Sequence, residues 1–233
     1  MRFFITGDTH GNLTRVINFI KRFKLDANDN ILILGDAGLF WRKDQEDAKY
    51  WIELYEKECN GVHLYWIDGN HENFDIIKSW NCDNKSVYNN SEHIHYCPRG
   101  FETFIDIDCG DHIKARKALF LGGADSIDKF RRTKHLTWWE DETISEEDIK
   151  NITGSYYYIF THTCDMTTFN DYILDLCTIS GLDQSKIDHS SEEKLDKLFK
   201  NILFEEHYFG HFHTNKKLNN KHTCLFEDFI ELK

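Results

Sequence analysis

The sequence predicts an α/β protein with two stacked sheets and helices on their outer faces. In the first third of the chain, short apolar runs alternate with amphipathic stretches, which is typical of parallel strands joined by helices. The middle and the C-terminal part contain alternating runs and a hairpin turn, which indicate further strands. The chain has 233 residues, 40% of them hydrophobic, and no Gly/Ser-rich linker, so we expect one domain over residues 1–233.

The first third supplies three expected strands and two helices in strict alternation. The strand runs are continuously apolar, which predicts burial on both faces. The first helix repeats its apolar side chains on one face from Leu13 to Phe23. The expected elements are strands over 2–6, 31–34 and 62–67, and helices over 13–23 and 44–58.

The rest of the chain adds elements of both kinds. Residues 104–110 alternate Ile and Cys with Asp, which predicts a half-exposed strand. Ser145 and Asp148 have the spacing of a capping box, so a helix is expected to begin there. Another helix is expected from about Ser191, and its apolar stripe consists of Leu195, Leu198, Phe199 and Ile202. Further strands are expected over 117–123, 156–160 and 208–209, and on both sides of a turn at 219–220.

Composition and charge narrow the classes of function. The formal net charge of -12 argues against long duplex nucleic acid as a partner, because proteins that bind it carry a basic face. No apolar run approaches the roughly 20 residues of a membrane span, so no membrane partner is expected. The seven cysteines form no CxxC pair and no signal peptide is recognisable, which predicts reduced thiols in a cytoplasmic protein. The sequence makes no prediction about the oligomeric state.

Five of the apolar runs end in polar and titratable side chains. In open α/β sheets, ligands bind beyond the carboxyl ends of the strands, so five such ends meeting at one edge would form one site. The residues at these ends are Asp8, His10, Asp36, Asn70, His162, His211 and His213. Each alone could be an ordinary loop, turn or core residue, but the fivefold repetition favours a shared role. The histidines without such a pattern are expected to be structural or surface residues, namely His63, His93, His95, His112, His189, His207 and His222.

Two aspartates, one asparagine and several histidines form a set of potential metal ligands. This mixture of oxygen and imidazole suits Mn, Fe, Zn, Ni or Co better than Ca or Mg. Seven ligands exceed the needs of one tetrahedral ion, so with one bridging carboxylate they predict two divalent ions, and manganese is the ion expected to serve in vitro. Two such ions would bring four positive charges and the two aspartates remove two, which leaves a site complementary to a phosphate dianion.

The motifs GDTHG, GDAG, GNHE, THT and GHFH, in this order, resemble those of the calcineurin-like metallophosphoesterase family. The resemblance runs from Gly7 to His213 and implies a four-layer α/β/β/α sandwich of two mixed sheets with a dinuclear metal centre at strand ends. It implies that one metal site consists of Asp8, His10, Asp36 and His213. It implies that the other consists of Asp36, Asn70, His162 and His211, with Asp36 as the bridge. His71 takes the family's position for protonating the leaving group.

Other segments bear on the substrate. GDAGLFWRK and GNHENF lack the arginines with which the protein-phosphatase branch of the family holds phosphate, which argues against phosphoprotein substrates. The segment GGADSIDKFRR resembles one in a bacterial and phage-associated subgroup. Within it, Arg131 and Arg132 are candidates for binding the substrate phosphate, although a solvated basic face is the simpler interpretation.

Together these features predict an enzyme, a metal-dependent phosphoesterase that acts on a small or exposed phosphate ester. The expected nucleophile is a metal-bridging hydroxide, and His71 is the expected acid for the leaving group. One alternative is a nucleic-acid phosphodiesterase or end-processing phosphatase, whose affinity for oligonucleotides would be sensitive to salt. The other is a non-catalytic binding scaffold on the same fold, which should lack several ligands that this chain retains.

Overall fold

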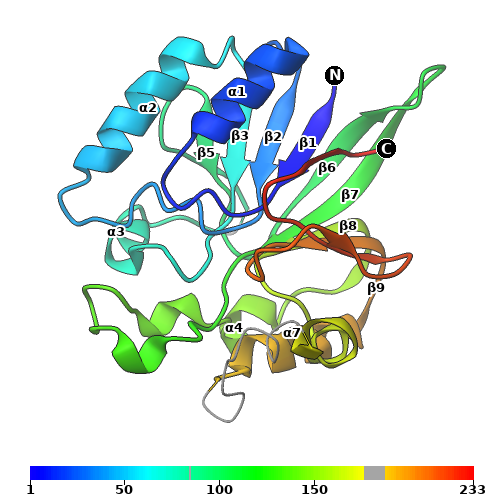
Figure 1. Ribbon diagram of the computed structural model, residues 1–233. Coiled ribbons are helices and arrows are strands. Elements are labelled where there is room, and N and C mark those ends of the chain that lie inside the picture. The colour runs from blue at the N-terminus through cyan, green and yellow to red at the C-terminus, as the bar shows by residue number, and fades with distance from the viewer. Residues whose placement is uncertain (84, 176–186) are drawn as a thin grey trace.

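The first of two six-stranded sheets is built mainly from the N-terminal third of the chain, as the computed structural model in Figure 1 shows. The structure describes residues 1–83, 85–175 and 187–233. The strands of this sheet, in spatial order, are β12 (Phe229–Glu231), β1 (Phe3–Thr6), β2 (Asn30–Ile33), β3 (His63–Trp66), β5 (Ile94–Tyr96) and β4 (Tyr88–Asn89). The four central strands run parallel, and both edge strands pair antiparallel.

The second sheet repeats this plan with strands from the middle and the C-terminal part of the chain. In spatial order they are β10 (Lys216–Lys217), β11 (His222–Cys224), β9 (Ile202–Phe209), β8 (Gly154–Thr161), β7 (Ile113–Leu121) and β6 (Phe101–Asp108). Again the central four strands are parallel and the edge strands antiparallel. The hairpin of β6 and β7 extends beyond the body of the molecule (Figure 1).

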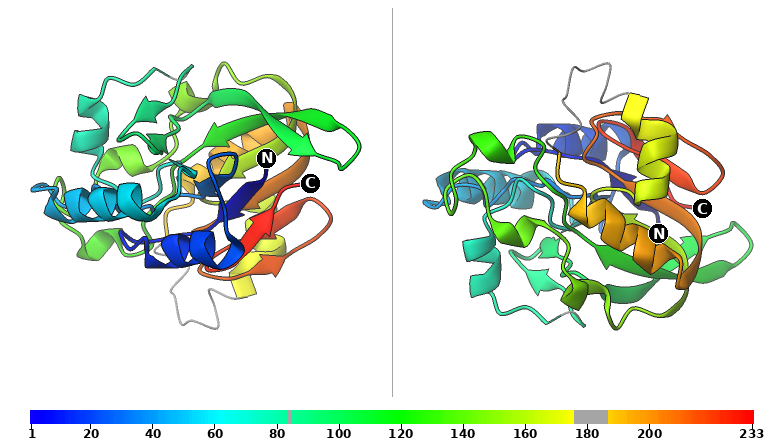
Figure 2. Two further views of the ribbon diagram at one scale, coloured as in Figure 1. Left: turned by 90° about the horizontal axis from the view of Figure 1, so that it is seen from above. Right: turned by 90° about the horizontal axis from the view of Figure 1, so that it is seen from below.

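Helices cover the outer face of each sheet, as the views from above and below in Figure 2 show. Those on the first sheet are α1 (Thr14–Phe23), α2 (Glu46–Glu58) and α3 (Phe74–Ser79). Those on the second sheet are α4 (Glu146–Ile149), α5 (Met166–Thr168), η3 (Phe169–Ile173) and α7 (Ser190–Phe199). Two short 3-10 turns, η1 (Lys129–Arg131) and η2 (Glu140–Glu142), lie in the connection from β7 to α4. The four-layer arrangement expected from the sequence is therefore confirmed.

The central strands are apolar throughout because both of their faces are buried. In β2, Ile33 faces the helical layer and packs in one cluster with Ile20 of α1. The preceding residue, Leu32, faces the second sheet and packs in another cluster with Phe160 of β8. Adjacent side chains of a strand point to opposite faces, so a strand between two apolar layers has no polar alternation.

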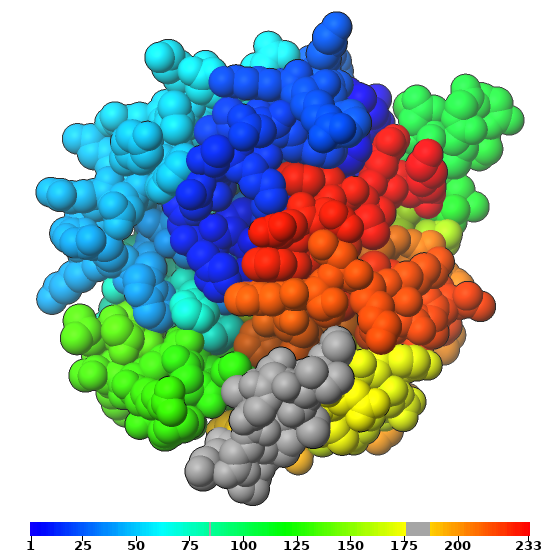
Figure 3. All heavy atoms as spheres, in the orientation of Figure 1, coloured from blue at the N-terminus to red at the C-terminus, as the bar shows by residue number. Residues whose placement is uncertain are grey.

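The C-terminal segment closes the first sheet beside the N-terminal strand. Phe4 of β1 pairs antiparallel with Glu231 of β12, and in Figure 3 the two ends of the chain lie against each other on the surface. This return carries Phe226 close to the carboxyl end of β1, where Gly7 N–H donates to its carbonyl at 3.1 Å. In the part of the chain that the structure describes, no helix has both the length and the apolarity needed to cross a membrane.

Some local expectations differ from the structure. Ile202 begins β9 instead of continuing the stripe of α7, which ends at Phe199. Ile202 nevertheless packs in the same cluster as Leu195, which explains why it matched the helical pattern. Phe23 is 48% exposed at the end of α1, so it does not belong to the buried stripe of that helix. The sequence did not reveal α3, β4 or β5, each too short to establish a period of its own. The capping box at Ser145 is confirmed, with both of its hydrogen bonds present.

Candidate metal centre

Seven side chains gather at the carboxyl ends of five parallel strands, three in the first sheet and two in the second. They are Asp8 and His10 after β1, Asp36 after β2, Asn70 after β3, His162 after β8, and His211 and His213 after β9. Contacts between their side chains cross from one sheet to the other. The structure thus brings together all seven residues that the sequence selected, and two groups can be distinguished among them.

The first group consists of Asp8, His10 and His213. The Nε2 atoms of His10 and His213 are 3.0 Å apart, and Asp8 Oδ2 lies 3.1 Å from His213 Nε2 and 3.8 Å from His10 Nε2. Ligands at about 2.0–2.2 Å from one ion are separated by distances of this size. These three atoms can therefore face one ion together.

The second group consists of Asp36, Asn70 and His162. His162 Nε2 lies 3.3 Å from Asp36 Oδ1 and 3.3 Å from Asn70 Oδ1. On the other side of the ring, Nδ1 donates to the carbonyl oxygen of Leu34 at 2.7 Å, which fixes the orientation of the imidazole. The ring of His211 lies beside it, with centroids 5.0 Å apart.

Asp36 lies between the two groups. Its Oδ1 atom faces His162 and accepts the backbone N–H of His71 at 2.7 Å. Its Oδ2 atom lies 3.9 Å from His10 Nδ1. Each oxygen thus faces a side chain of a different group, so Asp36 is the carboxylate that lies between them.

The electrostatics at Asp36 favour positive charge. Burial would raise the pKa of Asp36, but His162, His71 and His10 hold it well below its usual range. Burial would likewise lower the pKa of His162, but the carboxylate of Asp36 outweighs this effect and raises it to about 10. His211 behaves in the opposite way, because burial and the adjacent His162 lower its pKa to about 3 and keep the imidazole neutral. A neutral imidazole is the form that binds a metal ion.

The environment of the Asp8 carboxylate indicates whether a cation fits the site. Asp8 is buried, and its Oδ1 atom accepts the backbone N–H of His211 at 3.1 Å. Its Oδ2 atom is buried and accepts no hydrogen bond from the described residues. A buried carboxylate oxygen that accepts no hydrogen bond is costly, even with the imidazole of His213 3.1 Å away, and a divalent cation between Asp8, His10 and His213 would compensate it. With the mixed oxygen and imidazole donors, this observation fits a transition-metal centre.

Glycines make room for the ligands. A Cβ atom on Gly69 would lie 2.7 Å from His162 Nε2, and one on Gly210 would lie 2.5 Å from Asp8 Oδ1. A Cβ atom on Gly35 would overlap the ring of His162. Each of these glycines immediately precedes a ligand candidate, so the Gly-Asp, Gly-Asn and Gly-His pairs have a steric reason.

The backbone of the site is strained at four of the seven residues. The φ angles of His10, Asp36, His211 and His213 are 47°, 47°, 67° and 48°. L residues seldom adopt this left-handed region, and such outliers concentrate at functional sites, where the surrounding structure imposes them. No local sequence signal indicated this conformation.

Of the two candidate arginines, only Arg132 contacts the site. Its Nη2 atom donates to His71 Nε2 at 2.9 Å, and its Nη1 atom donates to the carbonyl of Asn70 at 3.2 Å. Asp128 holds the Nε atom at 2.6 Å, and the Arg132 side chain is 8% exposed. Arg131 is exposed and lies over the ring of Phe130.

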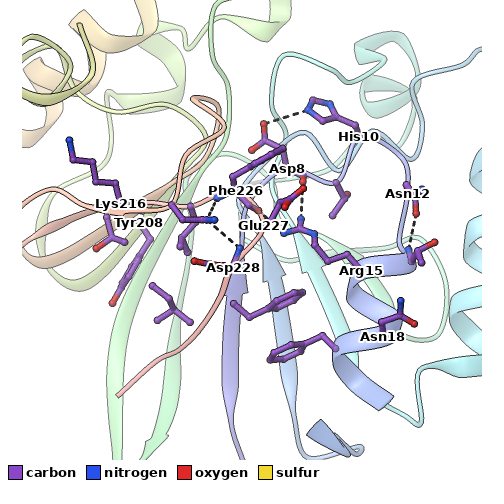
Figure 4. A pocket seen from close by; sticks show the side chains of 18 of the residues that line it. Asp8, His10, Asn12, Arg15, Asn18, Tyr208, Lys216, Phe226, Glu227 and Asp228 are labelled. Atoms are coloured by element: carbon purple, nitrogen blue, oxygen red, sulfur yellow. Dashed lines mark hydrogen bonds and ion pairs between the residues drawn. The ribbon is translucent and has the colours of Figure 1, made fainter. Parts of the chain in front are cut away.

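Two cavities flank the centre. The larger has a volume of about 1140 Å³, and Figure 4 shows Asp8 and His10 at one end of it, with Asn18 of α1 farther along. The smaller has a volume of about 320 Å³ and is bounded by His10, Trp41 and His71 among others. His10 thus borders both cavities, and a substrate could reach the centre from either one.

The sequence did not identify the residues that support the candidate ligands from behind. The Asn70 amide donates to Ser126 Oγ at 3.2 Å, and Ser126 N–H donates to Glu142 Oε1 at 2.8 Å. Glu72 is buried and accepts Gly38 N–H at 3.0 Å, beside the Asp36 loop. Asn70 and Ser126 are 56 residues apart, and no local pattern could have connected them.

A two-sheet sandwich with potential metal ligands at shared strand ends defines a class of α/β metalloproteins. Within that class, the chain belongs to the calcineurin-like phosphoesterase family, whose model matches residues 1–215. The family predicted from the five motifs is thereby confirmed, and the bacterial and phage-type subgroup stays a prediction. One similar solved structure is "GAP50 the anchor in the inner membrane complex of Plasmodium", with 11% identity and a TM-score of 0.44 over 97% of this chain and 71% of that chain. No match is found among curated proteins.

Proposed function

We propose that the protein is a metal-dependent phosphoesterase that hydrolyses a small or exposed phosphate ester. The position of Asp36 between two groups of potential ligands is the observation that carries this proposal. Because the chain belongs to a family of phosphoesterases, we infer that this carboxylate would hold two ions. The ions would be manganese, iron, zinc or nickel, because the donors are mixed oxygen and imidazole.

The ligand assignment follows the two groups. One ion would be held by Asp8, His10, Asp36 and His213. The other would be held by Asp36, Asn70, His162 and His211. When bound, two divalent ions supply positive charge to the phosphoryl oxygens and lower the pKa of water between them.

His71 is proposed to protonate the leaving group, and Arg132 controls when it can do so. An acid of this kind is an imidazolium, in which both ring nitrogens carry protons. Arg132 donates to His71 Nε2, so His71 is neutral while this contact exists. A phosphate anion is a stronger acceptor for a guanidinium than a neutral imidazole. Substrate that attracts Arg132 would thus free Nε2 to take a proton from solvent, which His71 would then transfer to the leaving-group oxygen.

Metal analysis combined with substrate screening tests the proposal. The loaded wild-type protein should bind two ions per chain and hydrolyse at least one phosphate ester, screened among phosphomonoesters, diesters, nucleotides and oligonucleotides. Asp36→Asn should weaken both ions, whereas His10→Ala should weaken mainly one. A fully loaded protein with one ion or none would refute the dinuclear centre. Two bound ions without any hydrolysis would instead favour the scaffold alternative.

A further inference from the structure

Asp165, His207 and His222 form a second group of potential metal ligands. One ligand atom from each lies within 4.8 Å of the others. Asp165 caps α5, His207 lies in β9, and His222 lies in the neighbouring β11, where it is paired with His207. Both histidines were expected to be structural or surface residues, and no sequence pattern connected them.

The hydrogen bonds of His207 determine which ring nitrogen is free. His207 is fully buried. The hydroxyl of Thr161 donates its only proton to the carbonyl of Thr163, so it must accept from His207 Nε2, which lies 2.7 Å away. The proton of a neutral His207 is therefore on Nε2, and Nδ1 carries a lone pair. Metal-binding histidines commonly donate their other N–H to an oxygen in this way.

The Nδ1 atom of His222 faces the Nδ1 atom of His207. His222 Nδ1 lies 3.0 Å from His207 Nδ1, 3.3 Å from Thr168 Oγ1 and 3.9 Å from Asp165 Oδ2. A proton on His222 Nδ1 could join the two imidazoles, but the distance of 3.9 Å leaves it outside hydrogen-bond reach of Asp165 Oδ2.

A hydrogen bond between the two imidazoles would not explain the buried carboxylate of Asp165. Asp165 is 5% exposed, and its Oδ1 atom accepts the backbone N–H of Thr168 at 3.0 Å. Its Oδ2 atom is buried and accepts no hydrogen bond from any described residue. Burial of a carboxylate oxygen without a partner is costly, so a cation at this position would stabilise the fold.

A comparable group elsewhere in the protein lacks this feature. Glu56, Cys59 and His93 also place three potential ligand atoms within 4.8 Å of one another. There, however, His93 Nδ1 and Glu56 Oε2 are 2.6 Å apart, and the backbone N–H of His93 donates to Glu56 Oε1 at 2.9 Å. Both oxygens of Glu56 are satisfied, so that group is complete without an ion.

We propose that Asp165, His207 and His222 bind a single zinc ion, separate from the dinuclear centre. Imidazoles and carboxylates are common zinc ligands, with bonds of about 2.0–2.2 Å. Ligand atoms of a tetrahedral ion at that range are about 3.4 Å apart. This value lies between the 3.0 Å from His222 Nδ1 to His207 Nδ1 and the 3.9 Å from His222 Nδ1 to Asp165 Oδ2. The Thr168 hydroxyl or a water molecule would complete the shell. The ion would be structural, because its ligands are largely buried. Two of them also lie close along the chain to candidate ligands of the dinuclear centre. Asp165 follows His162 by three residues, and His207 precedes His211 by four.

A crystal of the zinc-saturated wild-type protein gives the direct test. An anomalous difference map at the zinc edge should contain a peak within bonding distance of Asp165 Oδ2, His207 Nδ1 and His222 Nδ1. A map without a peak at this position overturns the proposal. The result does not depend on the dinuclear centre, whose ions appear as separate peaks or not at all.

A pair of histidine variants provides an independent measurement in solution. His222→Asn should lower the zinc content of the saturated protein by one ion per chain and reduce the stabilisation by zinc in thermal unfolding. The matched control is His112→Asn, which alters an exposed histidine in the turn between β6 and β7 and should retain the wild-type zinc content. A folded His222→Asn protein with unchanged zinc content would refute the site. If His222→Asn fails to fold, the anomalous map of the wild-type protein still decides.

Discussion

Histidines of the same centre have opposite pKa shifts, which shows how strongly the environment of one residue determines its chemistry. His162 and His211 are both buried and their rings are neighbours. The pKa of His162 is raised because Asp36 outweighs the effect of burial, whereas burial and His162 itself lower the pKa of His211. At the scale of residues, the roles of His71 and Arg132 are therefore the ones to test.

His71→Asn should slow hydrolysis of esters according to their leaving group. A poor leaving group such as an alkoxide needs a proton in the transition state, and a positioned acid typically contributes 10²–10⁴-fold. A nitrophenolate spreads its own charge and needs much less help. We therefore expect a large loss of kcat on an alkyl phosphate, a small loss on a nitrophenyl ester and unchanged metal content. The comparison variant Asn70→Ala should lower metal occupancy and slow both esters. Equal losses on the two esters in His71→Asn would exclude the acid role.

Arg132→Ala should raise KM without changing the metal content, whereas Arg131→Ala should behave like the wild type. Arg132 lies against His71 and Asn70, and Arg131 is exposed, so the two adjacent residues form a matched pair. Steady-state kinetics with metal analysis measures the difference. If Arg131→Ala raises KM as much as Arg132→Ala does, a general effect of the basic segment explains both. Unaltered kinetics in both variants would exclude Arg132 from substrate binding and leave it as a structural contact of His71 and Asn70.

At the scale of elements, the connection from β7 to α4 supports the site from behind. Glu142 of η2 is almost completely buried and accepts hydrogen bonds from Ser126 N–H and Trp138 Nε1, both at 2.8 Å. Ser126 in turn contacts Asn70, so this segment helps to position a ligand candidate. Burial of Glu142 outweighs these hydrogen bonds and the attraction of Arg132, and raises the pKa of its carboxyl group to about 7.

Glu142 should make the protein less stable as pH rises. Its pKa is 4.5 in the unfolded chain and about 7 in the fold, so between these values the folded protein binds more protons than the unfolded one. The free energy of unfolding therefore falls across this range, by roughly 3 kcal/mol at 1.36 kcal/mol per pKa unit.

Glu142→Gln should lack that decline, which chemical denaturation at pH ~5 and pH ~8 would measure. The variant should gain stability relative to the wild type at the higher pH. Glu140→Gln is the control, because Glu140 lies in the same turn with a side chain that is 69% exposed. Parallel pH profiles of Glu142→Gln and the wild type would contradict this assignment.

At the scale of the whole molecule, contact between the two sheets holds the candidate metal centre together, because each sheet contributes part of it. Phe160 of β8 is fully buried in this interface, and its ring lies 5.1 Å from that of Phe120 and 6.2 Å from that of Tyr208. His162, two residues farther along, reaches across to Asp36 of the first sheet.

Phe160→Ala should lower the free energy of unfolding by about 3–5 kcal/mol, since it removes a buried ring and leaves a cavity between the sheets. Phe104→Ala is the matched control, because Phe104 of β6 is 65% exposed, and its loss should change stability by less than about 0.5 kcal/mol. Denaturant unfolding measures both values. A small loss in both variants would show that the sheets do not depend on this packing.

The sequence by itself determined the features that contiguous residues encode. Apolar period and length predicted most strands and the main helices, and polar residues at five strand ends predicted the seven side chains that the structure brings together. The motifs also identified the family that the comparison confirms. The single-domain organisation, the cytoplasmic location and the metal identity stay predictions, because they depend on more than local pattern.

Only the tertiary structure decided which distant residues meet. Arg132 reaches His71 across 61 residues, and His207 meets His222 because β9 and β11 are neighbours in the second sheet. Ile202 joins the cluster of α7 from a strand, which a linear period cannot distinguish from a helical turn. The physical reason is the same in each case. Local period depends on the geometry of one element, whereas these contacts depend on the order in which strands pair and on the way the two sheets pack.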